Sequence, residues 1–344
     1  MLLQEPKEEL HDFFVKYEMK SFVKDTMDTR EVKKEGSRSA VKQISSKLLQ
    51  DGALVYANVD NESYYDAVLY GFAVSLKEQT EYIELQDALA DTRFLAWLKE
   101  ENGKAVYDAK NFYHALHKNG IEFADVKFDV MIAAFLVDGT LSDYDKLAEK
   151  YQFDRSLLKD NVFGKKGKGK LVDLDEAARY AMLQTDHLQD LVSELDASLK
   201  EMEMKELFDT IEMPLTHVLY AMEKEGVVTS LSTLDEIARA TSDKIDTLSA
   251  QIYEMAGMEF NINSPKQLAQ ILYDELGLKA GKKRSTAADV LEKLAKQHPI
   301  IPLLLEHRKY QKIYSTYAVG LSKHVLKDGK IHTIFNQIQT QTGR

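Results

Sequence analysis

Apolar residues are spaced in two different ways along this chain. Before Leu207 they gather in short runs, some of them alternating with polar positions, and helical segments separate the later runs. The spacing predicts strands at 53–59, 67–74, 82–85, 105–108 and 126–128, and helices at 109–117, 130–137 and 173–204. Strands that alternate with helices are typical of an α/β layered domain.

From Leu207 onward the apolar spacing is helical throughout. Two long helices are predicted, one ending at Gly226 and one at Gly257, and the link at 226–232 leads us to expect that they pack as an antiparallel pair. A later helix opens at Pro299 and runs to about His324. After it, the chain carries a hairpin-turn signal, and the spacing predicts a strand. These features lie at Asp328-Gly329 and at 331–336.

A capped helix start at Ser264 is the clearest local signal in the helical half. The Ser264 hydroxyl can accept a first-turn N–H, Pro265 suits the first helical position, and Gly277 stands where the helix would end. The polar neighbours of this start are Asn261, Asn263 and Lys266. A helix N-terminus favours anions, although most capped helices bind nothing, so the surrounding sequence decides the interpretation.

The segment after this helix is rich in positive charge. Residues 279–286 carry four cations and two hydroxyls, and Thr286 with Asp289 predicts a capping box for the next helix. Further on, Arg308 and Lys312 lie four residues apart on one helix face.

Composition excludes several classes of function. The chain has 344 residues, which predicts two or three domains, and no cysteine, which excludes disulfides, cysteine-based zinc sites and thiol chemistry. The net charge of −11 argues against a basic coat, so any nucleic-acid surface must be a local patch. No apolar run is long enough to span a bilayer, and the N-terminus is not a signal peptide. His114 and His117 lack an assignable third zinc ligand and are interpreted as a surface pair.

Four segments resemble family A DNA polymerases, in the same order along the chain: 260–268, 285–294, 308–317 and 332–344. The resemblance is close after Phe208 and looser before it, where the chain is similar to the vestigial exonuclease domain of Gram-positive polymerases. It implies an α/β, ribonuclease-H-like (3′–5′ exonuclease-like) domain, followed by an all-α polymerase thumb and the first palm hairpin. The expected boundaries are 1–45 for a helical linker from a 5′-nuclease domain, 46–205 for the exonuclease-like domain, 206–326 for the thumb and 327–344 for a truncated start of the palm.

Proofreading exonucleases of this family hold two metal ions through four carboxylates, because two divalent ions must be both neutralised and positioned. The motif positions here, including the tyrosine of the third motif, are Asn58, Asp60, Phe112, Tyr180 and Gln184. Three of the four carboxylates are therefore missing. Asp186 lies two residues beyond Gln184, roughly 200° round the helix, and is expected to point elsewhere. The resemblance predicts no exonuclease activity.

The same resemblance implies that the thumb touches duplex DNA, mainly through the phosphate backbone. The candidate contacts are Asn261, Asn263, Ser264, Lys266, Lys282, Lys283, Ser285, Thr286, Arg308, Lys312, Ser315, Thr316, Asn336, Gln337 and Arg344. Arg344 matches the arginine that reads the minor groove at the primer terminus. Minor-groove acceptors are nearly common to all base pairs, so such an arginine tests pair shape without reading sequence.

The resemblance implies one part of a DNA polymerase of replication and repair, which extends a primer with dNTPs and Mg²⁺. The polymerase aspartates are expected past Arg344, so the chain is expected to bind no cofactor itself, and its own catalytic status is open. Expected partners are primer–template duplex and, in the complete protein, dNTP; the chain is expected to be a monomer of the bacterial cytoplasm and nucleoid, with no membrane association. Two alternatives remain: a stand-alone duplex-binding module and a residual proofreading exonuclease.

Overall fold

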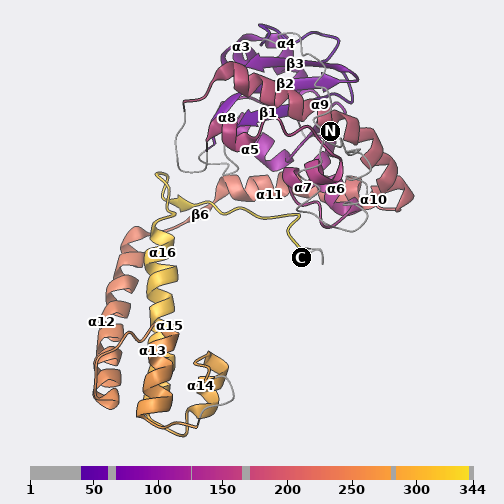
Figure 1. Ribbon diagram of the computed structural model, residues 1–344. Coiled ribbons are helices and arrows are strands. Elements are labelled where there is room, and N and C mark those ends of the chain that lie inside the picture. Colours follow the sequence, from indigo (N-terminus) through magenta and orange to yellow (C-terminus); the bar gives the residue numbers. More distant parts are fainter. Residues whose placement is uncertain (1–39, 61–66, 125, 165–170, 280–283, 341–344) are drawn as a thin grey trace, which may run out of the picture. The chain divides into compact units, whose positions relative to one another are not determined.

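The computed structural model describes residues 40–60, 67–124, 126–164, 171–279 and 284–340, which form two compact units (Figure 1). Among the described residues, the first unit runs to Met213 and includes Thr340, and the second spans Pro214–Gln339. Of the helical linker expected at 1–45, only residues 40–45 lie within the described residues.

The first unit contains a mixed β-sheet and the helices that cover it. Its strands are β1 (Leu54–Val59), β2 (Leu69–Leu76), β3 (Gln79–Glu84), β4 (Ala105–Val106) and β5 (Phe128–Asp129). Its helices are α3 (Leu85–Ala90), α4 (Thr92–Lys99), α5 (Ala109–Lys118), α6 (Val130–Val137), α7 (Tyr144–Lys150), α8 (Lys159–Phe163), α9 (Leu174–Glu201) and α10 (Lys205–Leu207), followed by the π-helical turn η1 (Phe208–Glu212). The strand order is β3-β2-β1-β4-β5; β1 to β3 are antiparallel, and β4 and β5 are parallel to β1. The predicted α/β layer is confirmed.

Helix α9 packs across strands β1, β2 and β3. Small residues on its inner face, Ala178 and Ala181, meet Ala73 and Tyr82 of the sheet, so the helix approaches the strands closely. Residues 40–45, expected to belong to a linker, pack beside this sheet: the Val41 N–H donates to the Tyr82 carbonyl at 2.8 Å.

The predicted strands of this unit have shifted limits in the structure: 67–74 is observed as Leu69–Leu76 and 82–85 as Gln79–Glu84, and two others differ for identifiable reasons. The strand expected at 105–108 ends at Val106, because Asp108 is left-handed (φ 59°) and caps α5 through the Asn111 N–H. The strand expected at 126–128 is Phe128–Asp129, and α6 begins directly after it.

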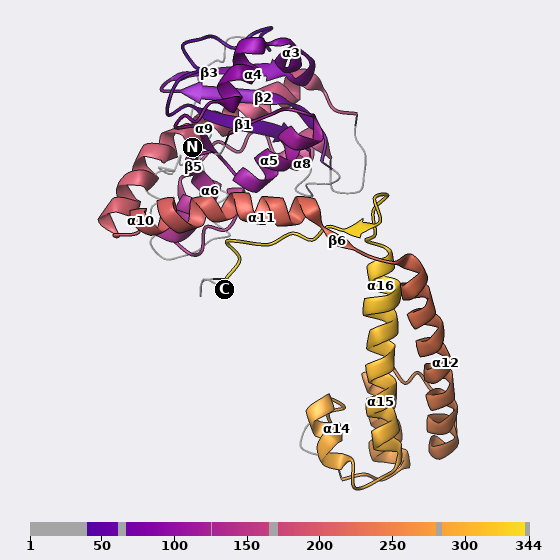
Figure 2. The ribbon, with the colours of Figure 1, turned by 180° about the vertical axis from the view of Figure 1, so that it is seen from behind.

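The second unit is a long helical arm with a small two-stranded sheet. Its elements are α11 (Met213–Glu225), β6 (Val227–Val228), α12 (Leu231–Ala256), α13 (Pro265–Gln270), the π-helical turn η2 (Ile271–Glu275), α14 (Ala288–Leu294), α15 (Ile300–Lys312), the π-helical turn η3 (Ile313–Ala318), α16 (Val319–Ser322) and β7 (Lys330–Ile331). In Figures 1 and 2, α12 runs antiparallel to the continuous rod formed by α15, η3 and α16.

The predicted pairing of the first two long helices is wrong. The periodic face of α12, with Leu248 and Ile252 buried, packs along α15, η3 and α16 instead of α11. Gly226 explains the difference, because its left-handed backbone (φ 66°) turns the chain out of α11 and into strand β6.

A single apolar cluster holds the far end of the arm together. It joins α12, α13, η2, α14 and α15 through buried side chains that include Ile252, Leu268, Leu272, Leu291 and Leu304. Beside this cluster, His307 of α15 meets the Ser249 hydroxyl of α12 at 3.2 Å, and burial lowers the pKa of the His307 imidazole.

The hairpin turn at Asp328-Gly329 is confirmed, but the strand after it is shorter than predicted. Gly329 is left-handed (φ 76°), and the Leu326 N–H donates to the Lys330 carbonyl at 2.9 Å. Of the predicted strand 331–336, only the first residue lies in β7, which pairs antiparallel with β6. The rest leaves the sheet, because β6 offers only two residues as a partner.

Gly226 and Gly257 give a matched pair of substitutions. Both glycines have positive φ, but a Cβ at Gly226 would lie 2.7 Å from the His332 ring, whereas a Cβ at Gly257 meets nothing within 4 Å. Gly257→Ala therefore suffers backbone strain alone, about 1–2 kcal/mol. Gly226→Ala is expected to lower the free energy of unfolding by about 1–3 kcal/mol more, because the ring must also move. Denaturant unfolding of both variants measures the difference, and equal losses would contradict it.

Candidate nucleic-acid interface and degenerate exonuclease site

Asn58 is the residue expected at the first metal-ligand position of the exonuclease-like unit. It lies on β1, is fully buried, and its Nδ2 donates to the Ala177 carbonyl of α9 at 3.0 Å and to the Tyr82 hydroxyl at 3.2 Å. Its Oδ1 has no hydrogen-bond partner. Gly71 pairs with Asn58 across the sheet, and a Cβ there would collide with Tyr82, so the glycine gives that ring its room. Asn58 is thus an uncharged residue that links β1 to α9 by a hydrogen bond.

The positions of the second and third motifs are also buried and uncharged. Phe112 of α5 and Gln184 of α9 are each 2% exposed, and the Gln184 Oε1 lacks a partner. Tyr180 packs edge-on against Phe163 with centroids 5.7 Å apart. Burial, then the neighbouring Tyr56, raises the pKa of the Tyr180 phenol well above its usual range, so the hydroxyl stays neutral.

The two carboxylates nearest these positions have other partners. Asp60 accepts the Val68 N–H at 2.9 Å and closes the start of β2 onto the end of β1. Asp186 accepts a short hydrogen bond from the Thr80 hydroxyl on the edge strand β3. Asp186 does point away from the motif positions, toward the sheet edge.

Asp129 is a buried carboxylate that the sequence reasoning missed. It accepts the N–H groups of Asp108 (3.1 Å), Ala109 (2.7 Å) and Met131 (2.9 Å), and so joins the starts of α5 and α6. Burial raises its pKa to about 6, against the hydrogen bonds that lower it. An aspartate directly before an apolar helix was the available sequence signal.

The described residues do not fit a two-metal site. The motif positions carry one carboxylate (Asp60), two amides, a phenylalanine and a phenol, and no group of three or more His, Cys, Asp or Glu side chains is placed to hold a metal ion within the described ranges. The reading of His114 and His117 as a surface pair is wrong for one member: His114 is 6% exposed, because it lies on the inner face of α5.

The capped start of α13 has the predicted geometry. Ser264 Oγ accepts the Gln267 N–H at 3.5 Å, and Pro265 is the first helical residue. Asn261 Oδ1 accepts the Asn263 N–H at 3.0 Å, which makes a tight turn before the cap. Asn261, Asn263 and Lys266 are exposed. The structure therefore gathers these polar side chains at one end of the arm.

The loop that follows is anchored at its end. The Tyr273 hydroxyl donates to the Ser285 carbonyl at 2.6 Å, and Arg284 forms an ion pair with Asp274 at 2.6 Å while lying over the Tyr273 ring. Lys282 and Lys283 lie outside the described residues.

The capping box predicted at Thr286 is wrong. Helix α14 starts at Ala288, has Ala287 at its N-cap position, and shows no side-chain cap. Thr286 is 7% exposed, and its carbonyl accepts a short hydrogen bond from Arg308 Nη1. Burial lowers the pKa of the Arg308 guanidinium. Arg308 thus joins α15 to the segment before α14.

The next candidates follow Arg308 along the rod. Lys312, the last residue of α15, is exposed, as are Ser315 and Thr316 in the π-helical turn η3. The Ser315 hydroxyl donates to the Gln311 carbonyl at 2.7 Å.

The last candidates lie at the other end of the arm. Asn336 is exposed, and its Nδ2 donates to Gln339 Oε1 at 2.6 Å. Gln337 lies beside it and is half-buried, and Arg344 is outside the described residues. The candidates thus fall into three groups on this unit: around the start of α13 and the segment before α14, along the rod of α15 and η3, and after β7. No described helix combines the length and apolarity needed to cross a bilayer.

Comparison with known proteins matches both units. Residues 55–191 match the ribonuclease H-like domain of DNA polymerase I, and residues 231–344 match DNA polymerase family A. DNA polymerase I of Geobacillus stearothermophilus is 36% identical over 309 residues, and that of Bacillus subtilis is 33% identical over 312. These alignments cover 88% of this chain but only 35% and 36% of the relatives, so the chain spans about a third of their length.

A solved structure is similar over the same extent. It is the POL domain of Pol1 from M. smegmatis in complex with DNA primer-template and dNTP, with a TM-score of 0.70 and 27% identity. The match covers 87% of this chain and 51% of that one. The chain therefore combines a region similar to the ribonuclease H-like domain of DNA polymerase I with a region similar to part of the polymerase domain of family A. Over most of its length it is similar to bacterial DNA polymerase I.

Asp129 gives the exonuclease-like unit a specific pH dependence. Its folded pKa of about 6 lies above the ordinary value of 3.8, so the folded protein binds this proton more tightly than the unfolded chain does. The free energy of unfolding therefore carries a component that falls as pH rises from about 4 to about 6, by at most about 3 kcal/mol. Asp129→Asn removes this component. The test is denaturant unfolding of both proteins across that range, and a pH-independent difference between them would contradict it.

Proposed function

We propose that this chain is the scaffold and duplex-gripping part of a template-directed DNA polymerase of bacterial replication and repair. The observation that supports it most is the likeness to a polymerase domain solved with primer-template DNA and dNTP. In this proposal 1–45 is a helical linker, 46–205 a vestigial 3′–5′ exonuclease domain, 206–326 the thumb, and 327–344 the beginning of the palm.

The grip is proposed to be mainly electrostatic and local. Lys266 and Lys312 are exposed cations on the helical arm, and the capped start of α13 adds a positive helix end. In a chain of net charge −11, such cations attract a phosphate backbone only where they gather. Contacts to phosphate fix the position of a duplex without specifying its sequence.

Arg308 has a different role from the lysines in this proposal. It is half-buried and tied to the Thr286 carbonyl, so it fixes the segment that carries Ser285 and Thr286 while its remaining N–H groups face the duplex. Lys282, Lys283 and Arg344 complete the proposed contact set from the family resemblance alone.

The exonuclease-like unit is proposed to be inactive. Two divalent ions require several carboxylates, and Asn58, Phe112 and Gln184 offer none. The chain is proposed to hold no cofactor of its own, and Mg²⁺ belongs to the complete polymerase. A monomer acting at the nucleoid in the cytoplasm fits this role.

Duplex binding by the purified chain tests the proposal. With about five phosphate contacts, log Kd against log salt is expected to have a slope of magnitude about 4 to 5, with affinity falling as salt rises. Lys312→Ala is expected to reduce that slope by about 1. Lys244→Ala is the matched control, because this α12 lysine already faces Glu306 at 3.8 Å. Titration of a labelled primer–template at several salt concentrations gives both values, and a flat salt dependence would contradict the electrostatic grip.

Incubation of the chain with a mismatched 3′ end and Mg²⁺ tests the exonuclease. No loss of the terminal nucleotide is expected, and Asn58→Asp alone is expected not to restore activity, because Phe112 and Gln184 still supply no carboxylate. Measurable Mg²⁺-dependent degradation by the unmodified chain would support a residual proofreading exonuclease instead.

A further inference from the structure

The segment that follows β7 has no regular secondary structure, yet one residue of α11 holds it at two points. That residue is Glu223, which lies in the last turn of the helix and is 1% exposed. Its backbone carbonyl and its side-chain carboxylate both accept hydrogen bonds from the segment 332–335.

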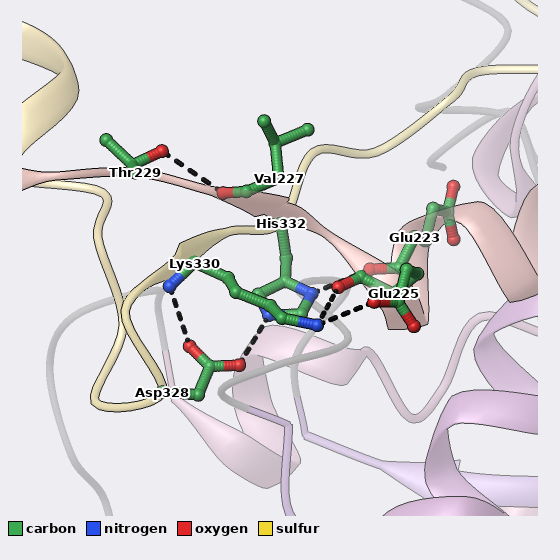
Figure 3. Close-up of polar contacts among 7 residues, drawn as sticks. All are labelled: Glu223, Glu225, Val227, Thr229, Asp328, Lys330 and His332. Carbon is green, nitrogen blue, oxygen red and sulfur yellow. Dashed lines mark hydrogen bonds and ion pairs between the residues drawn. The ribbon is translucent and has the colours of Figure 1, made fainter.

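The first point is the His332 ring (Figure 3). Its Nδ1 contacts the Glu223 carbonyl at 2.7 Å, and its Nε2 contacts the Asp328 carboxylate at 2.9 Å. The side chain is 7% exposed. Both ring nitrogens thus face an acceptor, and the ring sits over Gly226, where any Cβ would displace it. The ring has one available position.

The second point is the Phe335 backbone. The Phe335 N–H donates to Glu223 Oε1 at 2.8 Å. This bond fixes the chain immediately before Asn336 and Gln337. The segment lies outside the β-ladder, so its direction depends on bonds of this kind.

Lys330 adds further hydrogen bonds between this part of the chain and the end of α11. Its Nζ donates to the Glu225 carbonyl at 2.7 Å and to Glu225 Oε1 at 2.8 Å (Figure 3). The last carbonyls of a helix lack N–H partners from the helix itself, and cationic donors suit its negative end. Lys330 and His332 supply donors to two of these carbonyls. The helix end and the strand therefore order each other.

We propose that Glu223 is a positioning residue, which holds Asn336 and Gln337 in the orientation that the duplex requires. This rests on the proposed function. Asn336 is exposed one residue beyond the bond to Phe335, so loss of that bond frees the backbone from which it projects. Glu223 itself is buried and makes no contact with DNA in this role.

The test compares Glu223→Ala with Glu223→Gln, which keeps a side-chain oxygen that can accept the Phe335 N–H. Glu225→Gln is the matched control, because this neighbour is exposed and its backbone carbonyl still accepts Lys330. Glu223→Ala is expected to weaken primer–template binding about five- to tenfold and to speed amide exchange at Phe335. The salt slope is expected to stay unchanged, since no phosphate contact is removed. Glu223→Gln is expected to recover most of the affinity.

A double-mutant cycle separates positioning from general damage. In a background of Asn336→Ala with Gln337→Ala, Glu223→Ala is expected to cause almost no further loss, because its effect acts through those two side chains. An equal loss in both backgrounds, or full affinity despite fast exchange at Phe335, would overturn the positioning role. Absence of duplex binding by the unmodified chain would instead overturn the proposed function and this role with it.

Discussion

The arm exists because α12 buries its apolar face against the rod of α15, η3 and α16. Ile252 on α12 belongs to the same cluster as Leu272 and Leu304, so helices far apart in sequence have one core. Burial of several large aliphatic side chains supplies roughly 1.5–3 kcal/mol each. The polar turns, caps and hydrogen bonds at the surface therefore do not have to stabilise the arm themselves. The Asn261 turn, the Ser264 cap and the Arg308 tie are hydrogen-bonded additions to a frame that apolar packing already sets.

In the exonuclease-like unit, the absence of charge at most of the motif positions allows those positions to be buried. Four close carboxylates repel one another unless metal ions neutralise them, and removing them from water is costly. With Asn58, Phe112 and Gln184 in their places, the same positions are almost completely buried. Asn58 then ties β1 to α9 through the Ala177 carbonyl. These uncharged side chains therefore suit a region that packs as ordinary core.

Features fixed by neighbouring residues were predictable from the sequence, and features fixed across long separations were not. The Ser264 cap, the Asp328-Gly329 turn and most element limits follow from local chemistry, and the structure has them. Periodicity in α12 revealed a buried face but not its partner, because any apolar helix can cover such a face. The Thr286 cap failed for a similar reason: Arg308, a residue 22 positions away, takes its carbonyl and the helix starts later. Glu223 and His332 are 109 residues apart, and neither local sequence predicts that they are in contact.

The hydrogen bonds between the end of α11 and the residues of and after β7 also explain how the two-residue ladder of β6 and β7 can be stable. A hairpin of this size is marginal in water, since two pairs of backbone bonds scarcely offset the entropy of ordering the chain. Here the side chains of Lys330 and His332 both bond to the end of α11, and Glu223 of the same helix holds Phe335 a few residues further on. Each bond makes the next one more favourable, because the first bond has already reduced the conformational entropy of the segment. The end of α11 supplies hydrogen bonds that a further strand would supply in a larger sheet. The direction of the chain after Phe335 is therefore set by its bond to a helix rather than by pairing within a sheet.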